Sequence, residues 1–262
     1  MYSLVGYLRR QLQNAYKILL LLLCKMTTIV SALLTNINGY RSIEKYIEFG
    51  KKLLTLPINK VIFIERDIYE EHFSNVSNEN TTIVFIQKRD LYLYAYTDQI
   101  TDFSPMGDPQ KDTLEYMFVQ CNKTEWIRSA IEMNPYNSNN FAWIDFGVWH
   151  LIRDDQVFAD SCMNISQKQV DGVRIACGDP NYINNPECCK SILWFFLGSI
   201  FGGNRESLLK FANLVKHKCI QIIQEKKTIM WEINIWLLVY KDDPSLFNCY
   251  RACHDASILQ NY

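Results

Sequence analysis

The chain has 262 residues, 48% of them hydrophobic, and a formal net charge of −1 at pH 7. This length and composition predict one large α/β domain with an ample core. The balanced charge argues against a nucleic-acid-binding protein, which usually carries a basic face. The nine cysteines include no C-x-x-C spacing, so we expect reduced thiols in a reducing compartment rather than a zinc ribbon or a redox motif.

The first 26 residues have a pattern of their own. Arg9, Arg10 and Lys17 precede the apolar run 18–24, which is shorter than the roughly 20 residues that span a bilayer. A signal-sequence core is one interpretation, although no clear small-x-small cleavage site follows. We expect residues 1–26 to form a helical extension that packs on the domain or touches a membrane surface. The domain itself then covers residues 27–262.

The first third of that domain alternates strand and helix. Residues 27–35 are β-branched and apolar, which predicts a buried strand, and residues 36–39 predict a turn. Helical spacing runs over residues 42–56 and ends at Pro57. Residues 60–65 and 81–86 are two further predicted strands. This order favours a parallel sheet with crossover connections.

The remaining segments continue the same architecture. They predict a helix over 112–133, strands over 141–144, 173–177 and 192–201, a helix over 205–225, and apolar segments over 228–240 and 247–254. The aromatic run at residues 194–196 is interpreted as core. No internal repeat or long linker occurs, so one domain is expected.

Asp145 is the most informative single residue. This single acidic residue directly follows the apolar run 141–144, and Gly147 then indicates a bend in the chain. In open α/β sheets, ligands bind where strands end. A carboxylate there can hold a divalent metal or a ribose hydroxyl, and it can equally cap the next turn. His150 follows this turn, and we expect it at most to contact the residues that bind a ligand rather than the ligand itself.

Other candidates also have two interpretations. Arg41, after the first strand, can reach a phosphate or face solvent at the start of a helix. Gly202 and Gly203 can let a substrate approach the backbone or form a tight strand-to-helix turn. Glu232 is a lone acid among apolar residues; it can act as a general base, hold an acceptor sugar, or bond a core Lys or Arg.

Six segments in order carry a family resemblance. They are TIVSALLTNINGYRSIEKYIEFGKKLL, VIFIE, NKTEWIRSAIEMNPYNSNNFAWIDFGVWH, LGSIFGGNRESLLKF, IMWEINIW and LFNCYRACHDASIL. Together they resemble the HtrL-type (WlaTC-type) glycosyltransferase family from about residue 27 to the C-terminus. The most specific parts are WIDFG and the GG pair before a helix.

The resemblance implies a fold, an activity and a set of residues. The fold would be a GT-A-like, Rossmann-type mixed and mostly parallel sheet flanked by helices. The activity would be transfer of a sugar from a nucleotide-sugar donor, foremost a UDP-sugar, to a glycan or protein acceptor. Two alternatives remain: a non-catalytic glycan- or nucleotide-binding protein on the same fold, and a nucleotidyltransferase. On such a fold the candidate donor-binding residues are Asn36, Tyr40, Arg41, Lys123, Asp145, Gly147, Gly202 and Gly203, although Lys123 can equally be an exposed helix residue. Glu232, the lone acid described above, is the candidate catalytic residue.

The resemblance also implies a metal. Such folds usually carry Asp-x-Asp after a central strand, whereas this chain has Asp145-Phe146-Gly147, so the second acid is missing. A late histidine supplies a ligand in related glycogenin-like enzymes, and His254 lies in the corresponding region. Asp145 and His254 would hold Mn²⁺, or less readily Mg²⁺, together with diphosphate oxygens. The ion would neutralise charge on the leaving group.

The composition suggests a source and a location. Few glycines and many Asn, Ile, Lys and Tyr residues are typical of an AT-rich genome, such as that of a large virus or a protist. The reduced thiols expected above indicate a cytoplasmic protein, in the host cytoplasm if the source is viral, and peripheral association with a membrane is an alternative.

Overall fold

The computed structural model describes residues 26–37, 41–76, 79–186, 188 and 190–262. The predicted N-terminal extension (apart from its last residue) and Tyr40 lie outside these residues. Within them, no helix has both the length and the apolarity needed to cross a membrane.

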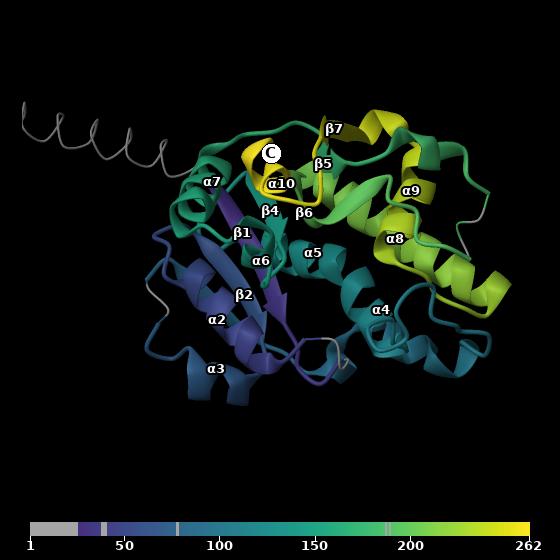
Figure 1. Ribbon diagram of the computed structural model, residues 1–262, viewed down its shortest axis with the longest axis horizontal. Helices are drawn as coiled ribbons and strands as arrows, with labels where there is room; N and C mark the ends of the chain where they lie inside the picture. The colour runs from purple at the N-terminus through teal and green to yellow at the C-terminus, as the bar shows by residue number, and fades with distance from the viewer. Residues whose placement is uncertain (1–25, 38–40, 77–78, 187, 189) are drawn as a thin grey trace, which may run out of the picture.

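A single seven-stranded sheet organises the molecule, in the order β3-β2-β1-β4-β6-β5-β7 (Figure 1). β3, β2, β1 and β4 are parallel, β6 runs antiparallel to both of its neighbours, and β7 is parallel to β5. The predicted mixed, mostly parallel sheet is therefore confirmed. The strands are β1 (Thr27–Leu33), β2 (Lys60–Ile64), β3 (Thr81–Phe85), β4 (Asn140–Ile144), β5 (Val173–Cys177), β6 (Phe196–Asn204) and β7 (Phe247–Arg251).

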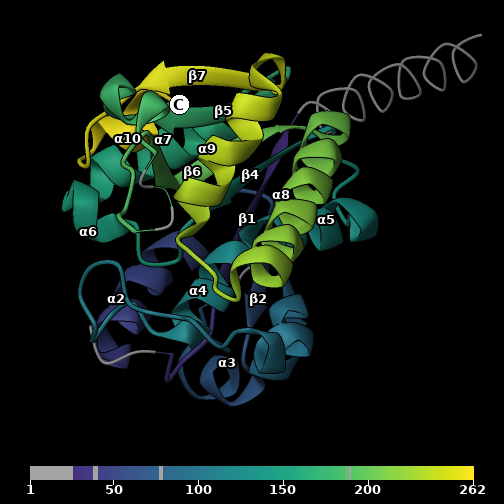
Figure 2. The ribbon, with the colours of Figure 1, turned by 90° about the vertical axis from the view of Figure 1, so that its right-hand side faces the viewer.

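Helices cover both faces of the sheet. They are α2 (Ile43–Leu54), α3 (Arg66–His72), α4 (Leu114–Cys121), α5 (Lys123–Met133), α6 (Trp149–Ile152), α7 (Asp155–Gln167), α8 (Arg205–Lys226), α9 (Glu232–Asp242) and α10 (Ser257–Gln260). Short 3₁₀ turns are η1 (Lys88–Asp90), η2 (Tyr92–Gln99), η3 (Pro180–Asn184) and η4 (Pro244–Leu246). Figure 2 shows α8 and α9 on the same side of the sheet.

The core has two halves because successive strand residues point to opposite faces. In β4, Phe141 and Trp143 join the apolar cluster beneath α5, α8 and α9. Ala142 and Ile144 join the cluster beneath α2, α7 and α10. All four side chains are at most 2% exposed. The result is a three-layer α/β/α domain with β4 near its centre.

Two predicted elements have different boundaries. The single helix expected over residues 112–133 is two helices, because the chain turns at Asn122 between α4 and α5. Thr113 caps α4 by accepting a hydrogen bond from the backbone of Tyr116. The strand expected over residues 192–201 is β6, which starts at Phe196 and runs on through both glycines to Asn204. The first difference has a functional consequence, since it makes Lys123 the first residue of a helix.

Candidate functional site

A cavity of about 610 Å³ opens at the edge of the sheet where β1 and β4 end and β6 begins. β1 lies between β2 and β4 in the sheet, so the order of the strands along the chain changes direction at β1. Such a topological switch point is where ligands bind in open α/β sheets. The volume lies within the usual range for small-molecule sites, roughly 300–1,000 Å³. The cavity is therefore the candidate site.

Lys123 forms ion pairs with two carboxylates on the cavity wall. Its Nζ lies 3.0 Å from Oδ1 of Asp145 and 3.0 Å from Oε1 of Glu232. The same ammonium donates to the backbone oxygen of Gly198 at 3.0 Å. The side chains of Lys123 and Glu232 are 3% and 2% exposed, whereas that of Asp145 is 32% exposed. Asp145 is thus the member of this trio that a ligand can reach.

The trio carries one net negative charge if both carboxylates are ionised. Burial by itself would lower the pKa of Lys123, but the nearby charges of Asp145 and Glu232 outweigh it and hold the pKa above its usual value. Lys123 therefore remains protonated at neutral pH. A buried ammonium between two carboxylates is stable only while both partners are present.

Local structure places each member of the trio. Glu232 is the first residue of α9, where the helix dipole favours an anion. Asp145 follows β4; its backbone N–H donates to Ser199 of β6 at 2.9 Å. The indole N–H of Trp143 donates to Oδ1 of Asp145 at 2.7 Å. Asp145 is therefore held by the sheet and by its own strand.

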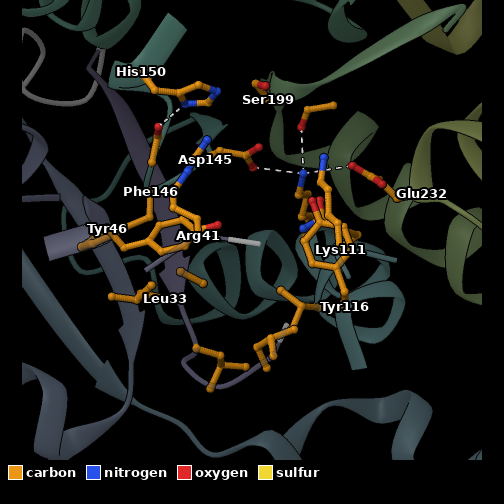
Figure 3. A pocket seen from close by; sticks show the side chains of 18 of the residues that line it. Leu33, Arg41, Tyr46, Lys111, Tyr116, Asp145, Phe146, His150, Ser199 and Glu232 are labelled. Atoms are coloured by element: carbon orange, nitrogen blue, oxygen red, sulfur yellow. Dashed lines mark hydrogen bonds and ion pairs between the residues drawn. The ribbon is translucent and has the colours of Figure 1, made fainter. Parts of the chain in front are cut away.

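Two further cations line the cavity on either side of Asp145. Figure 3 shows Arg41 on the side of Tyr46, and Lys111 on the side of Tyr116 and Glu232. The Arg41 guanidinium lies 5.2 Å from the centre of the Tyr46 ring. Burial lowers the pKa of Lys111, and the charge of Glu232 opposes this shift. Sequence reasoning missed Lys111, because no spacing or motif distinguishes it from a surface lysine.

Two histidines also line the cavity. The ring centres of His150 and His254 are 6.4 Å apart. Nδ1 of His150 lies 2.6 Å from the backbone oxygen of Gly147, within the turn that follows Asp145. Burial is the main cause that lowers the pKa of each imidazole. A lowered pKa favours the neutral imidazole at pH 7, and a neutral imidazole can accept a proton or a hydrogen bond.

Several predicted donor-binding residues also line this cavity. Asn36 has φ 53°, in the left-handed region that Asn tolerates, and its backbone oxygen accepts a hydrogen bond from Lys88. Gly147 packs closely against Arg41: a Cβ there would lie 3.1 Å from the guanidinium. Arg41, Lys123 and Asp145 complete the set that the structure brings together.

Gly202 and Gly203 require a correction. They lie inside β6, opposite Ala142 and Phe141 of β4, and outside the cavity. A Cβ on Gly203 would overlap the backbone oxygen of Gly172, and one on Gly202 would overlap the Tyr262 hydroxyl. Close packing within the fold explains why both residues lack side chains. The structure therefore does not bring these two glycines together with the other predicted donor-binding residues.

The aromatic run also needs a partial correction. Phe195 and Phe196 are buried, as expected for core residues, but Trp194 is 38% exposed and lines the cavity. Apolar composition alone could not separate the three, because their burial depends on how the chain enters β6.

The described residues do not fit a metal ion held by the protein. Asp145 and His254 line one cavity, but Oδ1 of Asp145 is already bonded to Lys123 and Trp143. No group of three His, Cys, Asp or Glu residues with metal-binding geometry occurs in the described part of the chain. Mn²⁺ and Mg²⁺ favour octahedral oxygen-rich sites, and the Lys123 ammonium would repel a cation at this carboxylate. Any ion here would have to be carried in by the ligand's phosphates.

Comparison with known proteins identifies the family. No curated protein matches the chain. A family model described as "Bacterial protein of unknown function (HtrL_YibB)" matches residues 25–256. That description refers to bacteria, which the composition did not indicate. The chain belongs to the HtrL_YibB family.

Proposed function

We propose that this protein is a glycosyltransferase that moves a sugar from a nucleotide-sugar donor, foremost a UDP-sugar, to a hydroxyl group of a glycan or protein. The observation that carries the proposal is the trio of Lys123, Asp145 and Glu232 on the wall of a cavity at the switch point of the sheet. Ligand-sized volume, a reachable carboxylate and flanking cations are what a sugar nucleotide requires.

The donor would lie over the ends of β1 and β4. Asp145 is a partly exposed carboxylate at the end of β4 and can accept a hydrogen bond from a ribose or sugar hydroxyl. Arg41, held against Tyr46, can pair with a phosphate through its forked N–H groups. Asn36 contributes to the wall at the end of β1. In this arrangement the diphosphate sits between Arg41 and Lys111.

The transfer step makes one carbon–oxygen bond, breaks one, and moves one proton. The acceptor oxygen attacks the anomeric carbon, and the bond from this carbon to the diphosphate oxygen breaks. The bonding electron pair leaves with the nucleoside diphosphate, and the hydroxyl proton passes to a carboxylate. Positive charge from Arg41 and Lys111 offsets the negative charge that gathers on the leaving group. We derive no step through a metal, because the donor set described above does not fit one.

Glu232 is our candidate for the proton acceptor. Its Oε1 is fixed by Lys123, while Oε2 is buried and has no hydrogen-bond partner among the described residues. Leaving such an oxygen unpartnered is costly, and an incoming hydroxyl would satisfy it. Lys123 then acts as a positioning residue that orients both Glu232 and Asp145.

One observation favours a second candidate, a non-catalytic nucleotide- or glycan-binding protein. Lys123 neutralises much of the charge of the carboxylates that catalysis needs. Such a protein would bind the same ligands in the same cavity without turning them over.

Release of nucleoside diphosphate from a panel of nucleotide sugars tests the proposal. Each donor is incubated with the protein in EDTA and, separately, with Mn²⁺. Asp145→Asn is the site variant, and Asp160→Asn, on the exposed surface of α7, is the matched control. We expect release from at least one donor in both conditions and its loss only in Asp145→Asn. Binding without release supports the second candidate, and neither binding nor release contradicts both.

A further inference from the structure

Trp194 is an exposed indole on the cavity wall. Three large hydrophobic side chains are exposed among the described residues: Phe85, Met133 and Trp194. Of these, Trp194 lines the cavity. The ring of Phe85 is covered by the Arg66 guanidinium, 3.9 Å from the ring centre. Apolar area left in water at a concave site costs free energy that a ligand can recover.

The surroundings of Trp194 hold it in place. Its ring centre lies 5.9 Å from that of Trp231 and 6.4 Å from that of His254. Trp231 is itself fixed, because its indole N–H donates to Asp112 at 3.1 Å. The chain neighbours Leu193 and Phe195 are 0% and 6% exposed, which anchors the backbone on both sides. The indole is therefore a prearranged surface.

Polar groups stand beside this aromatic wall. The Lys111 ammonium lies 4.7 Å from the centre of the Trp231 ring. Oε2 of Glu232 is buried, unpartnered among the described residues, and belongs to a side chain that is 2% exposed and lines the cavity. An apolar plane next to a hydrogen-bond acceptor and an ammonium matches a pyranose, which has one face of C–H groups and a rim of hydroxyls.

We propose that Trp194, supported by Trp231 and His254, binds a hexose ring of the acceptor. The C–H face of the sugar lies on the indole, and a hydroxyl of the same ring donates to Oε2 of Glu232. This surface precedes β6 and lies beside the segments that precede α9 and follow β7, whereas Asn36 and Arg41 follow β1. The cavity thus has a nucleotide half and a sugar half, with Asp145 between them. The role of this sugar as the acceptor rests on the proposed function, whereas the binding of a sugar at Trp194 does not.

Saturation-transfer NMR tests the sugar site directly. The probes are the methyl β-glycosides of glucose, galactose and N-acetylglucosamine. The variants are Trp194→Ala, the conservative Trp194→Phe, and the control Phe85→Ala, which removes an exposed aromatic outside the cavity. We expect at least one glycoside to receive saturation chiefly at H1, H3 and H5, the protons of one face. Its affinity should fall about three- to tenfold in Trp194→Ala and recover in Trp194→Phe.

A second titration separates this inference from the proposed function. UDP is titrated calorimetrically into the wild type and into Trp194→Ala, with thermal melts to confirm that both are folded. Equal UDP affinity in the two proteins, together with the glycoside result, supports the two-half arrangement. Absence of UDP binding to the wild type contradicts the proposed function and leaves the sugar site standing.

Three outcomes overturn the sugar site. They are the absence of glycoside binding to the wild type, saturation that is unchanged in Trp194→Ala, and loss of UDP affinity in Trp194→Ala. The last would mean that the indole stacks on the nucleobase.

Discussion

The ammonium of Lys123 lies 3.0 Å from Oε1 of Glu232, and both side chains are almost completely buried. They come from the first turns of α5 and α9, 109 positions apart in the chain. This ion pair fixes the wall of the cavity. Asp145, which also pairs with Lys123, is the more exposed carboxylate of the trio. Because the pair is buried, its removal has consequences for folding as well as for function.

Lys123→Met tests the structural part of this role. The substitution leaves Glu232 and Asp145 without their shared cation, so we expect the free energy of unfolding to fall by about 3–5 kcal/mol. Urea denaturation at pH 7 measures it. Adding Glu232→Gln to Lys123→Met should recover part of the loss, since it removes one unpaired charge. A loss below about 1 kcal/mol would mean that solvent reaches the pair.

Gly203→Ala tests the corrected role of the glycine pair. The new Cβ would overlap the backbone oxygen of Gly172, so we expect a loss of about 1–3 kcal/mol or more. Gly147→Ala is the matched comparison, because its Cβ would meet only the movable ends of Arg41 and Tyr46 at 3.1 Å. Thermal melts should rank Gly203→Ala well below Gly147→Ala, with weaker nucleotide binding confined to the latter. The reverse ranking would return Gly203 to the site.

Lys60 makes a pH-dependent contribution to stability. Burial lowers its pKa from 10.5 to about 8, and its ammonium donates to the backbone oxygens of Leu56 and Ile58. Between pH 8 and 10.5 the unfolded chain binds a proton at this site that the native chain has released, so stability rises with pH across that window. Relative to Lys60→Met, the wild type should gain roughly 1–3 kcal/mol from pH 8 to 10.5. Parallel urea titrations check this, and identical slopes would contradict it.

The sequence predicts the fold well because the signals for it are local. Apolar runs and helical spacing locate β1, α2, β2 and α8, since periodic burial follows from the element itself. Asp145 is predictable for the same reason: a strand end and a bend are visible within ten residues. Glu232 is a candidate because it is a lone acid among apolar residues, and the resemblance to a family adds Lys123.

The rest of the site depends on long-range packing. A lone acid such as Glu232 is compatible with a core Lys or Arg partner, but nothing near it in the chain identifies Lys123 as that partner. Gly203 lacks a side chain because Gly172, the residue just before the neighbouring strand β5, packs against it, and a local sequence pattern cannot show this contact. Lys111 and Trp194 belong to irregular segments whose position is set by the elements around them. Tertiary contacts, rather than propensity, decide these positions.

Asp145→Asn tests how the nucleotide is held. The amide keeps the shape of the side chain but loses the charge that pairs with Lys123 and that strengthens a hydrogen bond from a ligand hydroxyl. We expect weaker UDP binding by the same factor in EDTA and in Mn²⁺, and a stability loss of about 1–3 kcal/mol. Calorimetric titration in both buffers measures the affinities. A loss seen only with Mn²⁺ would support a metal bound by Asp145 and His254.

The most direct test of the central claim is the rate of nucleoside diphosphate release by Glu232→Gln. The measurement uses EDTA and the best donor from the panel, with wild type and Asp160→Asn as references. Because the amide cannot take the acceptor proton, we predict a rate at least about 100-fold below wild type, with UDP affinity unchanged. A Glu232→Gln rate within a few-fold of wild type, in a folded protein, would contradict the assignment of Glu232 as proton acceptor and the account of the site built on it.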